Sequence, residues 1–202
     1  YLRFKVRSRS KSPISFALTA IARLAISPAS STITAGSTQA YTATGYDALD
    51  NNLGDVTSST FFTISPDGSC AGASCTAKAA GPHTVTGSDG ASATASLTVT
   101  AGPLASLSLS PGSSSITAGA SQPYTATGLD SYGNNLGDAT ASTVFSIVPD
   151  GPCPGASCTA TVPGPHTVTG TKRWATGPAS LAVNRAPPPP PPTTPPAPPH
   201  RD

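Results

Sequence analysis

The sequence predicts an all-β protein made of two tandem antiparallel β-sandwiches. Three observations carry this prediction: apolar and polar residues alternate in short runs, Ser and Thr together fill 56 of the 202 positions, and Glu and Met are absent. Thr is a good strand former, and both Ser and Thr are tolerated on the solvent face of a sheet. Because helix formers such as Glu, Lys, Gln and Met are nearly missing, the composition argues against an α-helical fold.

One segment of the chain occurs twice, 83 residues apart. Residues 24–87 match residues 107–170 at 43 of 64 positions without a gap, and one residue is inserted afterwards near "TKRWATGP". This offset indicates two copies of one domain. The junction "TAGPLAS" is too short for a flexible tether, so we expect the copies to stack end to end. The predicted divisions are a basic arm at 1–20, repeats at 21–101 and 102–184, and a proline-rich tail at 185–202.

Each copy alternates with a period of two, which is the period of a half-buried strand. The runs "AYTATGYD", "STFFTIS", "PHTVTG" and "ATASLTVT" follow this rule, and clusters of Gly, Asn, Asp and Pro separate them. Short strands spaced in this way are typical of an antiparallel sandwich. The residues predicted to face the core of the first copy are Phe62, Ile64, Val85, Ala95, Leu97 and Val99, with Tyr41 and Ala43 on one face of their strand.

The first copy reads "ITAGSTQAYTATGYDALDNNLGDVT", then "AAGPHTVTG" and "ATASLTV", and the second copy keeps the same order. This order resembles the bacterial immunoglobulin-like (Big-type) repeats that occur in tandem on secreted and cell-surface proteins. The second copy has the Asp–x–x–Gly–Asn turn usual in that family, whereas the first has Asp50 in place of the Gly. The resemblance covers about 160 of the 202 residues. It implies two immunoglobulin-like sandwiches and no shared catalytic residues.

Two cysteines flank a four-residue turn in each copy, in "GSCAGASCTA" and "GPCPGASCTA". A structural zinc site needs four ligands and a redox pair is spaced C-x-x-C, whereas each copy offers two Cys and one His. A local disulfide at a hairpin is therefore the favoured prediction, with free thiols and a metal clip as alternatives. The expected pairs are Cys70 with Cys75 and Cys153 with Cys158. A disulfide indicates an oxidising compartment.

A turn rich in Asp and Asn also recurs, and closely spaced oxygen ligands can hold calcium. The spacing does not fit an EF-hand loop, and the chain has no Glu to act as a bidentate ligand. Asx turns explain the same residues without a metal, so they are the favoured prediction and no cofactor is expected. The calcium candidates under the alternative are Asp47, Asp50, Asp55, Asp130 and Asp138.

Three further side chains are candidates for a catalytic or ligand-binding role. His83 and His166 each precede an inward Val by two residues, so we expect them on the core face near a strand start. No nucleophile motif accompanies them, and a structural role is favoured over that of a general base. Trp174, the only Trp, lies beside Lys172 and Arg173 in the inserted segment. It is a candidate for ligand stacking or docking, although a partly covered loop aromatic is the favoured interpretation.

The N-terminal arm is basic, with a charge of +6 over residues 1–23 against −5 over residues 24–183. This polarity suits an anionic surface or the acidic body of a neighbouring copy. Nucleic acid is disfavoured as a partner because the arm offers few aromatics for stacking. The arm reads as a donor strand or as the remnant of a preceding repeat, and its alternating apolar residues are Leu2, Phe4, Val6, Ile14 and Phe16.

The C-terminal "APPPPPPTTPPAPPHRD" predicts a polyproline II segment, in which Thr193 and Thr194 are candidates for O-glycosylation. No apolar run approaches the ~18–20 residues of a membrane span. The chain begins at Tyr1 without a recognisable signal peptide, so we expect a processed form or a fragment.

Together these features predict a secreted or cell-surface structural protein that is not an enzyme. It is expected to self-associate as part of a filament, stalk or surface layer, through its immunoglobulin-like domains and strand addition by the arm. The alternative is an adhesin or cell-wall module that binds a glycan or another surface protein.

Overall fold

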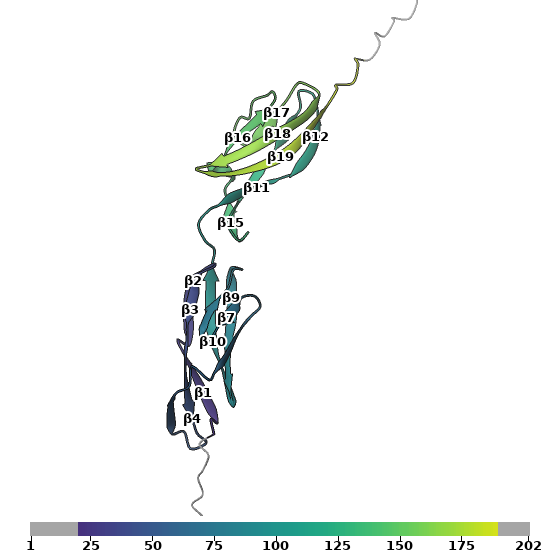
Figure 1. The fold of residues 1–202 in the computed structure, drawn as a ribbon. Helices are drawn as coiled ribbons and strands as arrows, with labels where there is room; N and C mark the ends of the chain where they lie inside the picture. The colour runs from purple at the N-terminus through teal and green to yellow at the C-terminus, as the bar shows by residue number, and fades with distance from the viewer. Residues whose placement is uncertain (1–19, 190–202) are drawn as a thin grey trace, which may run out of the picture. The chain divides into compact units, whose positions relative to one another are not determined.

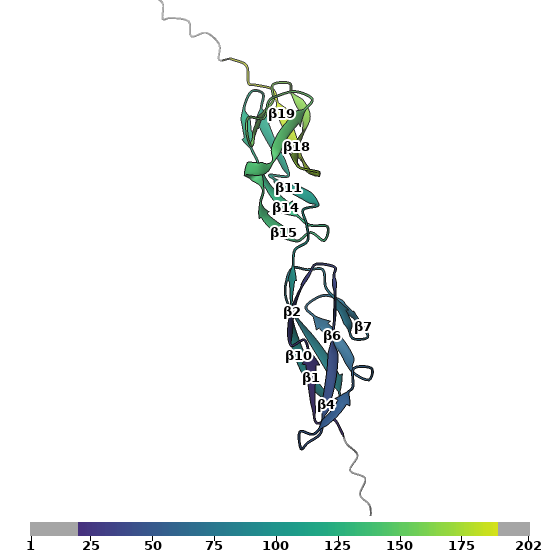
Figure 2. The ribbon, with the colours of Figure 1, turned by 90° about the vertical axis from the view of Figure 1, so that its left-hand side faces the viewer.

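The computed structural model describes residues 20–189 and divides the chain into two compact units, with the boundary between Thr100 and Ala101 (Figures 1 and 2). Every regular element in this range is a β-strand apart from one 3-10 turn, Thr140–Ser142, which confirms the all-β prediction. No helix between residues 20 and 189 is long and apolar enough to span a lipid bilayer. Outside the described range lie the arm residues Leu2, Phe4, Val6, Ile14 and Phe16 and the tail residues Thr193 and Thr194.

Between residues 20 and 100, the first unit is a sandwich of ten strands. A four-stranded sheet in the order β2-β10-β9-β6 forms one layer, and the sheets β1-β4-β5 and β3-β8-β7 oppose it. The neighbours β6, β9 and β10 have the order of strands C, F and G in an immunoglobulin-type sandwich. The strands are β1 (Arg23–Ser27), β2 (Ser30–Thr34), β3 (Thr38–Ala40), β4 (Thr42–Tyr46), β5 (Asn52–Asp55), β6 (Phe61–Ser65), β7 (Ser69–Ala71), β8 (Ser74–Thr76), β9 (Gly81–Asp89) and β10 (Ala91–Thr100).

The second unit repeats this arrangement. Its four-stranded sheet has the order β12-β19-β18-β16, and the sheets β11-β14-β15 and β13-β17 oppose it. The strands are β11 (Ser106–Ser110), β12 (Ser113–Thr117), β13 (Ser121–Pro123), β14 (Thr125–Leu129), β15 (Asn135–Asp138), β16 (Val144–Val148), β17 (Ser157–Thr159), β18 (Gly164–Lys172) and β19 (Ala175–Asn184).

The core of each unit is formed by the alternating residues of both layers. Val85, Leu97 and Val99 are buried as predicted, together with Phe62 and Ala95. Tyr41 and Ala43 are also buried and therefore share one face of their chain segment, as expected. Ile64 is only half-buried, whereas its counterpart Ile147 on β16 is buried.

Candidate binding site

The turn between β18 and β19 differs from its counterpart in the first unit. Lys172 pairs with Ala175, so that Arg173 and Trp174 form a two-residue hairpin turn. In the first unit Asp89 pairs with Ala91, and Gly90 alone lies between them. Arg173 has a φ of 55°, a backbone conformation uncommon for residues other than Gly, Asn and Asp. The inserted residue thus places a cation and the only Trp at the tip of this hairpin.

A surface pocket of about 350 Å³ lies beside the turn. Trp174 lines it and remains 70% exposed, so it is less covered than the favoured interpretation of the sequence supposed. Its indole Nε1–H donates to the carbonyl oxygen of Leu104 at 3.3 Å, which anchors one edge of the ring. The guanidinium of Arg173 lies 5.8 Å from the ring centroid, within the range of a cation–π contact. The other lining residues are Pro103, Gly128, Leu136, Gly137, Asp138, Ala139 and Lys172.

Small side chains give the pocket its room. Gly128 packs so closely that a Cβ there would lie 3.0 Å from Leu104. The residue matching Gly128 in the first unit is Gly45, where a Cβ would meet Ile21 and Val56 at 3.2 and 3.3 Å. The second unit has Ala139 at the position of Val56, so a smaller side chain lines the pocket there.

The rim of the pocket carries mixed charge. Lys172 occupies the place that Asp89 takes in the first unit, and Asp138 faces it. The hydroxyl and the backbone N–H of Thr140 hold the pKa of Asp138 below its usual value, and the charge of Lys172 acts in the same direction. Apolar walls with a few polar groups at the edge are typical of ligand and peptide sites.

Four of the five Asp residues considered for calcium form Asx turns. Asp47 Oδ1 accepts the backbone N–H groups of Leu49 and Asn51, both at 2.9 Å. Asp130 Oδ1 accepts those of Tyr132 and Asn134, both at 2.8 Å. Asp55 and Asp138 likewise each accept the N–H of the residue two positions on. Within residues 20–189 no three His, Cys or Asp side chains gather as a metal site would require.

Burial works to raise the pKa of Asp130, but hydrogen bonds from Asn134, Gly102 and Tyr132 outweigh it and hold the pKa at about 2.

Asp50 departs from the Asx-turn pattern of the other candidates. Its φ of 65° matches the 83° of Gly133 in the second copy, and its carboxylate accepts two hydrogen bonds from Arg23, at 2.6 and 2.8 Å. Asp adopts this left-handed conformation more readily than most residues, and here the ion pair with Arg23 accompanies it.

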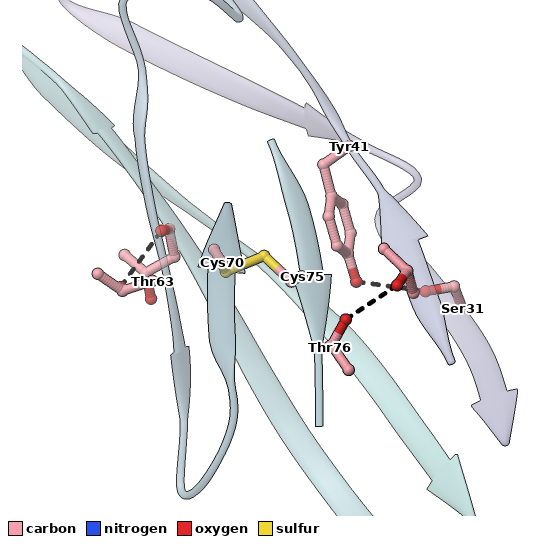
Figure 3. The surroundings of a disulfide bond; sticks show 8 residues. Ser31, Tyr41, Thr63, Cys70, Cys75 and Thr76 are labelled. Atoms are coloured by element: carbon pink, nitrogen blue, oxygen red, sulfur yellow. Dashed lines mark hydrogen bonds between the residues drawn. A yellow bond between two sulfur atoms is a disulfide. The ribbon is translucent and has the colours of Figure 1, made fainter. Parts of the chain in front are cut away.

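The cysteines form one local disulfide per unit. In the first unit Cys70 on β7 stands opposite Cys75 on β8, and their sulfurs are bonded (Figure 3). In the second unit Cys153 is bonded to Cys158. Cys75 and Cys158 are fully buried, and no free cysteine remains among the described residues. Each disulfide therefore closes a short loop in the segment that connects an edge strand to a long strand. This segment joins β6 to β9 in the first unit and β16 to β18 in the second.

Both histidines have an Asp partner that the sequence patterns did not predict. His83 Nε2 contacts Asp67 Oδ1, and His166 Nε2 lies 2.5 Å from Asp150 Oδ1. The second oxygen of Asp150 accepts the N–H groups of Thr161 and Val162. The available signal was a "PDG" sequence that recurs at the same offset, 16 residues before each His. These pairs tie a loop to a core strand, which is a structural role.

A scan of protein-family models and a search of curated proteins find no match to this chain. Among solved structures, the S-layer protein rSbsC(31-844) is 18% identical with a TM-score of 0.33, over 81% of this chain and 28% of that one. The Escherichia coli adhesin FdeC is 17% identical with a TM-score of 0.39, over 79% and 62%. The N-terminal four Ig domains of Dscam1 isoform 6.44 are 10% identical with a TM-score of 0.33, over 81% and 46%. The chain thus spans less than two thirds of each of these proteins.

Proposed function

We propose that this chain is a non-enzymatic structural protein of the cell exterior, a segment of a filament, stalk or surface layer built from Big-type immunoglobulin-like repeats. The observation that carries the proposal is the repeated sandwich with its own disulfide in each copy. Disulfides persist in oxidising compartments outside the cytosol. They also suit small domains with limited cores, and the buried residues here are richest in Ala.

Assembly proceeds by strand addition, with residues 1–20 of one copy pairing along an open sheet edge of the next. The first unit is the suitable acceptor, because residues 20–100 carry five Asp against Arg23 and Lys78, whereas the arm is basic. Its edge strand β6 pairs with β9 alone among the described residues and leaves Phe61 69% exposed. Main-chain hydrogen bonds would hold the arm, and alternating side chains would set its register.

Deleting residues 1–20 is expected to abolish assembly and to leave both units folded. Electron micrographs of the full chain should show polymers that disappear in the truncated chain, while its circular dichroism retains the β-sheet signal. A second variant with Leu2→Asn, Phe4→Asn and Val6→Asn keeps the basic charge and should fail in the same way. Polymers of normal length in the truncated chain would contradict strand addition.

The second candidate function is that of an adhesin or cell-wall module, which the pocket beside Trp174 favours. Here Trp174→Ala is expected to reduce binding to a glycan array at least about tenfold, as for an aromatic anchor at the centre of a site. Leu49→Ala, which removes another largely exposed apolar side chain, should leave binding unchanged. A purely structural protein would give no glycan signal in either variant.

A further inference from the structure

We propose that the pocket beside Trp174 binds the proline-rich tail, residues 187–199, of a second copy of this chain. The inference rests on the self-association in the proposed function. It adds a second contact between copies, one that does not involve the arm. The pocket presents the exposed face of Trp174, with Leu136 41% exposed beside it and Leu104 and Pro103 in the wall. Aromatic grooves of this kind recognise proline-rich segments, whose extended conformation is already set before binding.

The tail complements this surface. Residues 187–199 contain ten prolines and no charged side chain. Proline lacks an N–H donor and fixes φ, which excludes the run from a sheet edge and favours the polyproline II conformation. The carbonyls of a polyproline II segment have no internal partners. Lys172 and Arg173 at the rim are donors only, so they can hydrogen-bond to these carbonyls while the proline rings contact the Trp.

The other end of the chain is a poorer occupant. Residues 1–19 carry five basic side chains and no acidic one. Lys172 and Arg173 at the pocket would repel that segment, whereas they do not oppose a neutral run of prolines. The two ends of the chain thus have different targets, the arm matching the acidic first unit and the tail matching the Trp pocket of the second.

The position of the tail indicates that it comes from another molecule. Trp174 precedes the first residue of β19, and the tail leaves after the last, Asn184, at the opposite end of the unit (Figure 1). Ten strand residues at ~3.3 Å each separate the pocket from this exit by ~33 Å. The proline run begins three residues later, at Pro187, and the fixed φ of successive prolines disfavours a reversal toward the same unit. A contact between opposite ends of identical units is heterologous, and its repetition builds an open chain of copies.

The fluorescence of Trp174 can report binding at the pocket, because Trp174 is the only Trp in the chain and the tail has none. Its emission spectrum is recorded for the full chain from about 1 μM to about 1 mM, the range of weak specific contacts. We expect a blue shift at high concentration that dilution reverses. A synthetic peptide of residues 185–202, added in excess to the dilute chain, should reproduce the shift. The concentration dependence should be lost in a tail variant carrying Pro187→Ser, Pro188→Ser, Pro189→Ser, Pro190→Ser, Pro191→Ser and Pro192→Ser.

A matched pair of substitutions tests the pocket without removing the fluorophore. Leu136→Asn should weaken the peptide titration at least about tenfold, whereas Leu49→Asn, at an exposed leucine of the first unit, should leave it unchanged. A shift that survives in the tail variant would overturn the proposal, as would one that is independent of concentration, the mark of a chain folding back on itself. Emission that responds to a glycan mixture and not to the peptide would identify a glycan site instead. Deleting residues 1–20 tests strand addition by the arm, and its result is seen in micrographs. The fluorescence experiments test binding of the tail, so the two proposals can fail independently.

Discussion

His166→Ala is expected to lower the free energy of unfolding of the second unit by about 3 kcal/mol. The imidazole is fully buried, so the substitution leaves a cavity in a tightly packed core. It also removes the hydrogen bonds of both ring nitrogens, Nδ1 with the carbonyl of Gly164 and Nε2 with Asp150. Asp150 then no longer connects its loop to β18 and keeps only its contacts to the loop at Thr161 and Val162.

Denaturant unfolding followed by Trp174 fluorescence measures this change, since the only Trp belongs to the second unit. The matched control is His83→Ala, which makes the same change in the first unit and should leave the Trp-reported midpoint where it was. A decrease of less than about 1 kcal/mol for His166→Ala would show that the pair is dispensable.

The same pair makes the units sensitive to acid. His166, followed by the N–H of Thr161, lowers the pKa of Asp150 to about 2 from its ordinary 3.8. A carboxyl whose pKa is lower in the folded state contributes stability above its unfolded value and loses it as the pH falls toward the folded value. The second unit is therefore expected to lose stability between about pH 4 and about pH 2. Asp130, whose pKa is also about 2, contributes over the same range, so Asp150→Asn should reduce this dependence without abolishing it. An unchanged slope in that variant would refute the assignment.

The alternation of apolar residues was sufficient to predict the buried face. Val85 and Leu97 are fully buried because the side-chain period of a strand is two, so one inward residue fixes the direction of the others. The repeat also helped, since an Asp-rich turn that occurs twice is explained by the backbone bonds it makes in both copies. These features depend on neighbours within a few residues along the chain.

The pairing of His166 with Asp150 and the pocket beside Trp174 could not be predicted in that way. Asp150 lies 16 residues from His166 across a turn and a strand, and the recurrence of this spacing in both copies does not by itself show that the two side chains touch. The pocket brings together four segments separated by up to 70 residues, and one of its lining residues is Ala139, where the first copy has Val56. Long-range packing of this kind is decided by how the sheets are placed against each other.

Replacing both cysteines of the second unit, with Cys153→Ala and Cys158→Ala, is expected to lower its free energy of unfolding by about 2 kcal/mol. The loop-entropy relation gives this value for a closed segment of six residues. The buried Cys158 makes Ala the suitable replacement, because Ser would add an unpaired hydroxyl to the core. The disulfide lies between β16 and β18, so its loss should loosen the segment that also carries Asp150.

Trp174 fluorescence again reports the second unit, and the pair Cys70→Ala and Cys75→Ala serves as the control that should not move the Trp-reported transition. Dithiothreitol should lower the wild type to the level of the second-unit variant and leave that variant unchanged. Non-reducing peptide mass spectrometry of the native protein should find each Cys bonded to its neighbour five positions away. Free thiols, or bonds that join the two units, would remove the main support for an oxidising compartment and with it the placement of this protein outside the cell.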